Sequence, residues 1–466
     1  MLEKYFVARK KLYPQNVKGK FRKLKSRLNL FFLGIYCFSP FLRFDRGPSA
    51  SNQAILIDIT NSKIYFFFIE IWAQEVFYLA GILILSAIAL FFVTSLFGRV
   101  WCGYTCPQTV WTDIFIAIER FFQGDRNDRI LLDRKNNFKK FYKKSLTHIS
   151  WILISLITGL VFVNYFNDSL NLLKKIINLN FNEISLKVLG WISGIGFMTY
   201  LMAGFAREQV CTHMCPYARF QSVMFDDNTL IISYDKKRGE ERGKWHRGES
   251  FENRGHCIDC KQCVVVCPTG IDIRNGLQME CIACGLCIDA CDEVMEKVGL
   301  PKGLIRYDTL SHLLDPLPQK KFRFLQARTF YYSAILILVA SLMLTSLIYK
   351  PQIETSIFQE RNPLFITLSD GSIRNVYNLK IINKNHQSKK FSLAISKPIF
   401  AEIKISNHDE KNLTIPAETA LDLKVFVTIP AQKIDEISED QLLIEMILED
   451  LDTKKIEKIS TIFIGK

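Results

Sequence analysis

Eight cysteines within residues 257–291 repeat one spacing, C-x2-C-x2-C-x3-C, in two sets. The first set is Cys257, Cys260, Cys263 and Cys267, and the second is Cys281, Cys284, Cys287 and Cys291. This spacing is typical of cubane iron–sulfur clusters, in which three cysteines of a run bind one cluster and the fourth binds its neighbour. We therefore expect two [4Fe–4S] clusters, one bound by Cys257, Cys260, Cys263 and Cys291 and the other by Cys281, Cys284, Cys287 and Cys267.

Disulfides and zinc are the alternatives for these eight cysteines, but the doubled spacing argues against both. Asp292 follows the last cysteine, where the cluster pattern has proline, and that proline is not a ligand. Twelve of the 13 cysteines lie in tight metal-type spacings, and the remaining one, Cys37, is expected to pack as an apolar side chain. Reduced thiols indicate that the clusters face the cytoplasm.

A second motif, C-x3-C-P, occurs twice, and its cysteines are Cys102, Cys106, Cys211 and Cys215. Both copies follow an apolar run, a small residue and an arginine, which is Arg99 or Arg207, so we interpret them as an internal repeat. Pro107 and Pro216 suit the first position of a helix, where the helix dipole would favour thiolate at the preceding cysteine. We predict that these four cysteines are reactive or ligating, and soft thiolates select Cu(I), zinc or iron–sulfur.

The elements that must hold these cysteines include several membrane spans. The 466 residues include 36 Phe, and apolar runs at 28–44, 76–97, 149–166, 186–206 and 329–349 predict five spanning helices. Lys and Arg number ten in residues 98–147 and eighteen in 207–328, but two in 45–75 and two in 167–185. By the positive-inside rule, the amino terminus and the clusters are cytoplasmic. This asymmetry also accounts for much of the net charge of +14, so no nucleic acid partner is expected.

The remaining segments complete a multi-domain membrane protein. We expect a basic cytoplasmic segment at 1–27, spans one to four within 28–206 with the first C-x3-C-P loop at 102–107, a cytoplasmic two-cluster ferredoxin-like insertion within 207–328, the fifth span at 329–349, and a periplasmic domain at 350–466. Seven short alternating runs in this cysteine-free last part predict an all-β, immunoglobulin-like sandwich. Residues 120–147 are interpreted as an amphipathic helix on lipid, and 235–254 as a mobile linker.

The stretches WCGYTCPQTVWTDIF, CTHMCPYARFQ and CIDCKQCVVVCPTGIDIRNGLQMECIACGLCIDACDEVM, together with the terminal sandwich, resemble the cytochrome c oxidase accessory protein family of the CcoG/FixG type. The resemblance runs through nearly the whole chain. It implies a bacterial inner-membrane iron–sulfur protein that acts in assembly of cbb3-type cytochrome c oxidase and has cupric reductase activity, with Cu(II) as substrate and Cys102, Cys106, Cys211 and Cys215 as its site. It also implies copper-delivery or oxidase-assembly proteins as partners, with an unidentified electron donor.

Two other functions are compatible with the same motifs. One is a quinol dehydrogenase subunit, because paired cubanes and C-x3-C-P loops also resemble the membrane ferredoxins of periplasmic nitrate reduction; a quinol site would favour it, and the sequence shows no convincing one. The other is an assembly scaffold or redox sensor whose clusters catalyse nothing. Clusters that cannot be cycled reversibly would support that interpretation.

Overall fold

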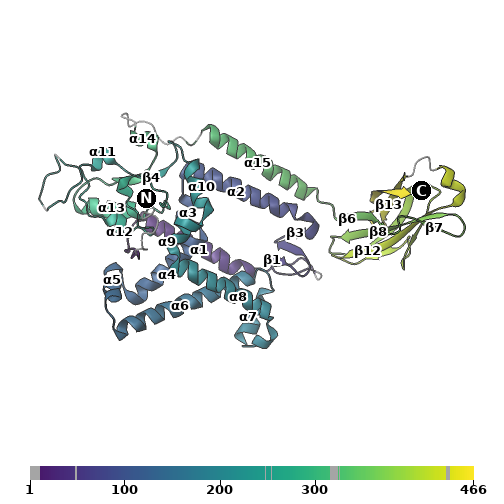
Figure 1. The fold of residues 1–466 in the computed structure, drawn as a ribbon, viewed down its shortest axis with the longest axis horizontal. Helices are drawn as coiled ribbons and strands as arrows, with labels where there is room; N and C mark the ends of the chain where they lie inside the picture. The colour runs from purple at the N-terminus through teal and green to yellow at the C-terminus, as the bar shows by residue number, and fades with distance from the viewer. Residues whose placement is uncertain are drawn as a thin grey trace, which may run out of the picture. The chain divides into compact units, whose positions relative to one another are not determined.

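The computed structural model describes residues 11–47, 50–246, 248–252, 254–314, 324, 326–436 and 441–465. The chain divides into two compact units, one comprising residues 1–42 and 53–343 and the other 43–52 and 344–466 (Figure 1). Residues 1–10 of the predicted basic segment and 315–323 of the predicted cluster segment lie outside the described residues, as do Arg247 and Asn253 of the predicted linker.

In the described part of the chain, four helices are long and apolar enough to cross a membrane. They are Ala73–Phe97, made of η3 (Ala73–Glu75) and α2 (Phe77–Phe97); α6 (Phe138–Val163); Leu186–Phe205, made of α8 (Leu186–Thr199) and the π-helical turn η5 (Tyr200–Phe205); and α15 (Ala327–Ile348). They correspond to the second to fifth predicted spans. The fold class expected from the sequence is confirmed, with four such helices in place of about five.

The predicted first span at 28–44 has a different structure. Helix α1 (Lys20–Phe38) begins eight residues earlier and is followed by η2 (Ser39–Phe41). Its first turns are basic, and they are held by Asp113, which lies 2.8 Å from Arg22 and 3.6 Å from Lys25. Because Lys25 is buried in this ion pair, the first half of α1 packs as part of the protein, and most of its exposed large apolar side chains, such as Leu30 and Phe31, lie in the second half.

Short elements join these helices in the first unit. They are the hairpin-linked sheet β1–β2–β3 (Ile55–Asp58, Lys63–Phe66, Ile69–Trp72), α3 (Val100–Tyr104), α4 (Pro107–Gln123), α5 (Arg126–Arg134), α7 (Ser169–Ile177), η4 (Phe181–Glu183), α9 (Arg207–Gln209), the π-helical turn η6 (Val210–Met214) and α10 (Pro216–Met224). The predicted amphipathic helix at 120–147 is divided among the end of α4, α5 and the start of α6. Helix α6 packs against α4 and α8 (Figure 1).

The cysteine-rich segment closes on itself through an antiparallel pair, β4 (Ile231–Tyr234) and β5 (Ile305–Asp308). Between these strands lie α11 (Lys236–Gly239), α12 (Gln262–Val265), η7 (Ile273–Asn275) and α13 (Leu286–Lys297), and α14 (Leu310–Leu314) follows β5. The predicted mobile linker is anchored at its start, because Arg238 donates a 2.9 Å hydrogen bond to the carbonyl of Lys302.

The second unit is an immunoglobulin-like sandwich. One sheet has the order β10–β12–β8–β6 with β7 beside β8, and the other has the order β11–β9–β13–β14. Their strands are β6 (Ile353–Gln359), β7 (Ile366–Thr367), β8 (Ile373–Asn383), β9 (Lys389–Lys397), β10 (Glu402–Ile405), β11 (Leu413–Ile415), β12 (Ala420–Ile429), β13 (Gln441–Asp450) and β14 (Ile456–Ile464), with η8 (Ala431–Glu436) before β13. Alternate residues of the paired strands, such as Tyr377, Phe391 and Met446, are fully buried between the sheets.

Candidate metal centres

The first cavity in the cysteine-rich segment is lined by the thiols of Cys257, Cys260, Cys263 and Cys291. Two of these, Cys257 and Cys260, come from the loop that leads into α12, while Cys263 lies in α12 and Cys291 in α13. Asp259 and Lys261 adopt left-handed backbone angles, with φ of 51° and 57°, which bend this loop tightly enough for its cysteines to face one space. Arg274 fixes the loop, since its guanidinium pairs with Asp259 at 2.5 Å and with Asp272 at 2.6 Å.

The second cavity is lined by Cys267, Cys281, Cys284 and Cys287, with Cys263 also at its edge. Left-handed backbone angles also bend this loop, because Ala283 and Gly285 have φ of 51° and 73° before α13 begins. Cys263 therefore lines both cavities, which makes them neighbours. The thiols thus gather in the two crossed sets of four that the spacing predicts, and their ligation of iron stays a prediction.

The chemistry of these donor sets fits iron–sulfur clusters. Burial raises the pKa of Cys263 and of Cys281 to about 12, so neither thiol ionises at neutral pH unless a cation binds its sulfur. Burial also raises the pKa of Cys287. Eight soft sulfur donors around two adjacent, mostly apolar cavities match the needs of cubane clusters and offer little to hard cations, which prefer oxygen.

The two C-x3-C-P motifs have the helical geometry expected from their prolines. Cys106 is the N-cap of α4 with Pro107 at the first turn, and Cys215 is the N-cap of α10 with Pro216 in the same place. The four thiols come close enough to interact, because Cys106 and Cys215 both raise the pKa of Cys102.

Thiolate character is expected at Cys106 and Cys215 because each precedes a helix, and it is absent at Cys106. Burial is the largest influence, and it raises the pKa of Cys102 to about 11, that of Cys211 to about 12, and that of Cys106 above its usual value. The helix dipole therefore does not outweigh desolvation here. As in the cysteine-rich segment, ionisation of these thiols requires a bound cation.

The two arginines of the repeat have different partners. Arg99 is buried and donates hydrogen bonds to the carbonyls of Met279 and Ala218, which joins the second cluster loop to α10. Its charge lowers the pKa of Cys102 and of Cys211, against the effect of burial. Arg207 instead pairs with Glu119 at 2.9 Å.

The C-x3-C-P loops pack directly on the backbone of the second cavity. A Cβ atom at Gly103 would lie 2.6 Å from the carbonyl oxygen of Ile282 and 3.0 Å from the Cα of Cys284, so only glycine permits this approach. The Tyr104 hydroxyl donates a 3.0 Å hydrogen bond to the Cys284 carbonyl. Cys102 and Cys211 pack against the same apolar group, which includes Cys284. Sequence reasoning missed this junction, because its contacts are separated by about 180 residues.

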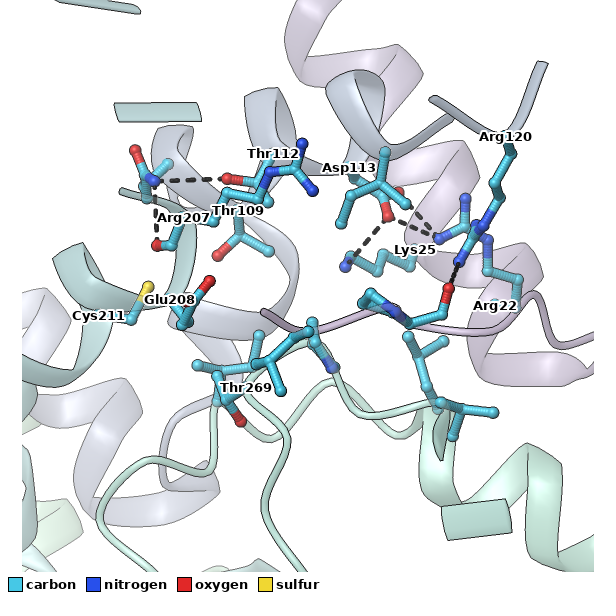
Figure 2. A pocket seen from close by; sticks show the side chains of 18 residues that line it. Arg22, Lys25, Thr109, Thr112, Asp113, Arg120, Arg207, Glu208, Cys211 and Thr269 are labelled. Carbon is cyan, nitrogen blue, oxygen red and sulfur yellow. Dashed lines mark hydrogen bonds and ion pairs between the residues drawn. The ribbon is translucent and has the colours of Figure 1, made fainter. Parts of the chain in front are cut away.

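A pocket beside Cys211 extends this junction towards α1 and α4 (Figure 2). Cys211 and Glu208 lie on one side, Thr269 lies on the loop after Cys267, and Asp113 lies among Arg22 and Lys25 on the other side. Lys25 and Arg22 together lower the pKa of Asp113, although burial acts in the opposite direction. The pocket therefore adjoins both kinds of cysteine site and has fixed charges along one wall.

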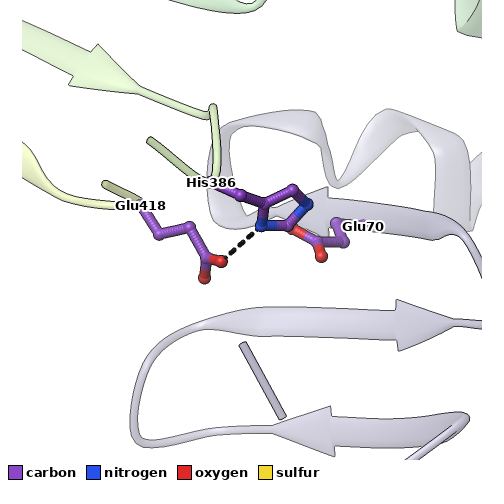
Figure 3. Close-up of side chains that lie close together, drawn as sticks. All are labelled: Glu70, His386 and Glu418. Carbon is purple, nitrogen blue, oxygen red and sulfur yellow. Dashed lines mark hydrogen bonds and ion pairs between the residues drawn. The ribbon is translucent and has the colours of Figure 1, made fainter. Parts of the chain in front are cut away.

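In the second unit, a pair of titratable side chains lies apart from any cysteine. His386 Nδ1 lies 2.7 Å from a carboxylate oxygen of Glu418 on the sandwich (Figure 3). Glu418 is buried and His386 is partly exposed. This pair joins the loops after β8 and before β12, so we interpret it as a contact that stabilises the sandwich.

Three family models match the chain. Residues 206–310 match a 4Fe-4S dicluster domain, residues 79–124 match a 4Fe-4S binding domain, and residues 343–466 match the IG-like fold at the C-terminal of FixG. Together with the apolar helices, these matches define a membrane-bound iron–sulfur protein of electron transfer.

Similar proteins show which family the chain belongs to. The chain is 39% identical to the nitrogen fixation protein FixG of Rhizobium meliloti, over 94% of this chain and 90% of the relative. It is also 39% identical to the protein RdxB of Cereibacter sphaeroides, over 99% and 97%, and 41% identical to RdxA of the same organism, over 92% of each. The chain belongs to the FixG family.

Proposed function

We propose that this protein reduces Cu(II) to Cu(I) at the four cysteines of its C-x3-C-P motifs, in the service of assembling a cbb3-type cytochrome c oxidase. The observation that carries the proposal is the packing of Cys102 and Cys211 against the apolar group of side chains that includes Cys284. A copper ion bound by these thiols would lie beside a loop that is suited to an iron–sulfur cluster. Thiolates prefer Cu(I) over Cu(II), so the ligands themselves favour the reduced product.

Two [4Fe–4S] clusters would be held by the crossed sets of cysteines around the two cavities, and each would supply one electron at a time. Reduction of one Cu(II) to Cu(I) consumes one electron. The residues of the chain have three tasks in this scheme. Copper is bound by the four thiols of Cys102, Cys106, Cys211 and Cys215, which lose their protons as it binds. Arg99 fixes the C-x3-C-P loops to the cluster domain. Gly103 keeps the distance between these loops and the cluster domain short.

The proposed topology follows from the charge distribution. The cysteine-rich segment would face the cytoplasm, where thiols stay reduced, and the sandwich would face the periplasm of a bacterial inner membrane. The basic helix α5 and the basic first turns of α6, with exposed Phe138 and Phe141, would rest on anionic lipid. Copper-delivery or oxidase-assembly proteins are the proposed partners, and the sandwich is a candidate docking module for them.

Single-turnover copper reduction by the purified protein tests this assignment. The clusters are reduced with dithionite, the excess dithionite is removed, and Cu(II) is added with a Cu(I)-specific chelator as reporter; Cys102→Ala and Cys211→Ala are expected to lose nearly all Cu(I) formation while their iron content stays unchanged. Cys37→Ala is the matched control, because Cys37 lies in α1 away from both motifs. Full activity in both loop variants would reject the copper site.

A further inference from the structure

A second cavity, of about 350 Å³, lies between α4, α6 and the end of the Leu186–Phe205 helix. One wall is aromatic: the His148 and Phe205 rings are nearly parallel, at 18°, with centroids 6.0 Å apart, and Trp151 meets His148 edge-on at 5.1 Å. Gly204 leaves room for this wall, since a Cβ atom there would lie 3.3 Å from the Trp151 ring. The volume and the lining are typical of a site for a small planar ligand.

Polar groups are fixed at the edge of this cavity. Arg207 is held between the Glu119 carboxylate, at 2.9 Å, and the face of Trp151, at 5.2 Å from the ring centroid. His148 Nδ1 lies 3.0 Å from the Tyr200 hydroxyl, which orients the imidazole. No hydrogen bond within the described residues engages its Nε2, so this nitrogen can bond a ligand.

The position of the cavity links it both to the membrane and to the cysteines. His148 and Trp151 belong to one candidate span, and Phe205 ends another, so the cavity lies where a ligand dissolved in lipid can reach it. Its lining residues Leu12, Arg207 and Glu208 also line the pocket beside Cys211 shown in Figure 2. Arg207 precedes Cys211 by one helical turn. The π-helical turns η5 and η6 flank this connection, and such turns occur frequently at functional sites.

We propose that this cavity binds a membrane quinol and that oxidation of the quinol supplies the electrons for the cysteine sites. A quinol is a planar ring with two opposed hydroxyls, which suits an aromatic wall with an imidazole nitrogen at its edge. Its oxidation to the quinone breaks two O–H bonds and releases two electrons and two protons. The two predicted clusters accept one electron each, and His148 Nε2 accepts the two protons one after the other and passes each to solvent.

This inference rests on the proposed electron transfer and names its donor. The cavity also differs from a lipid-headgroup site, because Lys11 and Lys144 at its edge are both already paired with Asp133. The aromatic wall and His148 are therefore the features available to a ligand. An ionisable residue within a candidate membrane span is by default a candidate functional residue.

The test uses the full-length, cluster-loaded protein with decylubiquinol as the probe. Binding of decylubiquinone is followed by quenching of tryptophan fluorescence, and anaerobic reduction of the clusters by decylubiquinol is followed by absorbance and EPR. His148→Gln, which removes the proton acceptor, and Gly204→Leu, which fills the cavity, are expected to slow cluster reduction at least about tenfold. Gly190→Leu is the matched control, because Gly190 lies on α8 with open space around its Cα.

Iron content and reduction by dithionite report whether each variant is folded. Equal rates of decylubiquinol oxidation in all variants, or no reduction of the wild-type clusters by decylubiquinol, would overturn the inference. So would quenching that depends on added phosphatidylglycerol and not on the quinone. Clusters that decylubiquinol reduces but Cu(II) does not reoxidise would support the quinol site and reject the copper proposal, so the two failures are distinguishable.

Discussion

The two groups of cysteines in this protein are positioned in different ways. The eight cysteines of residues 257–291 gather through local turns with left-handed residues, and their thiols line cavities in a domain with few regular elements. The two C-x3-C-P motifs lie more than 100 residues apart in sequence, each with its second cysteine at the start of a helix, and helix packing brings them together. The first group should therefore need its metal in order to fold, whereas the helices should hold the second group in place without one.

The largest effect is expected from Cys284→Ala. This change removes a ligand from the second predicted cluster and also disturbs the junction with Cys102. Iron content should fall from about eight to about four atoms per chain, because a [4Fe–4S] cluster is lost as a unit. The cluster domain should also become sensitive to protease, as metal-dependent folding requires. Unchanged iron content would show that Cys284 is not a ligand.

Gly103→Ala should weaken the junction without removing any thiol. The added methyl would press on the Ile282 carbonyl at 2.6 Å, and such overpacking costs roughly 1–3 kcal/mol. Copper reduction should slow while iron content stays the same. Gly34→Ala is the control, since Gly34 lies in α1 with open space around it. If the two alanine variants behaved alike, the close approach of the loops would have no part in function.

Tyr104→Phe tests one hydrogen bond across the same junction. The variant keeps the ring and loses the 3.0 Å bond to the Cys284 carbonyl, which should destabilise the folded state by about 1 kcal/mol. A lower midpoint in thermal unfolding of the first unit, with little change in copper reduction, is the expected result. A loss of activity as large as in the cysteine variants would give Tyr104 a direct part in electron transfer.

The smallest effect should come from Glu418→Gln in the cysteine-free sandwich. The change removes the charged partner of His386, and because His386 is partly exposed the loss should be at most about 1 kcal/mol. Thermal unfolding of the full-length protein should show a small shift in the sandwich alone. Cluster absorbance and copper reduction should match those of the wild type, and a change in either would assign the sandwich a redox role.

Sequence reasoning succeeded where the signal was local. The spacing from Cys257 to Cys291 predicts the two crossed sets of thiols that line the cavities, and Pro107 and Pro216 predict the helix starts that follow Cys106 and Cys215. Period-two alternation predicts most strands of the sandwich. It misses β11, because three residues are too few to show a period, and β6, whose residues are partly buried on both faces.

Sequence reasoning failed where contacts between residues far apart in sequence decide the structure. The start of α1 depends on Asp113, an acidic partner more than 80 residues away that takes the charges of Arg22 and Lys25. Arg207 likewise pairs with Glu119, which is 88 residues away in sequence, and no local motif shows this contact. The aromatic cavity around His148 unites three helices, and no single segment carries its signal.

The central claim is that electrons pass from the cluster domain to copper at the C-x3-C-P cysteines. Anaerobic titration of the dithionite-reduced protein with Cu(II) tests it most directly, with cluster absorbance and EPR followed while a Cu(I)-specific chelator reports the product. We expect one Cu(I) for each cluster electron lost, and loss of this coupling in Cys102→Ala and Cys211→Ala with the clusters intact. Clusters that stay reduced in the presence of excess Cu(II) would contradict the claim.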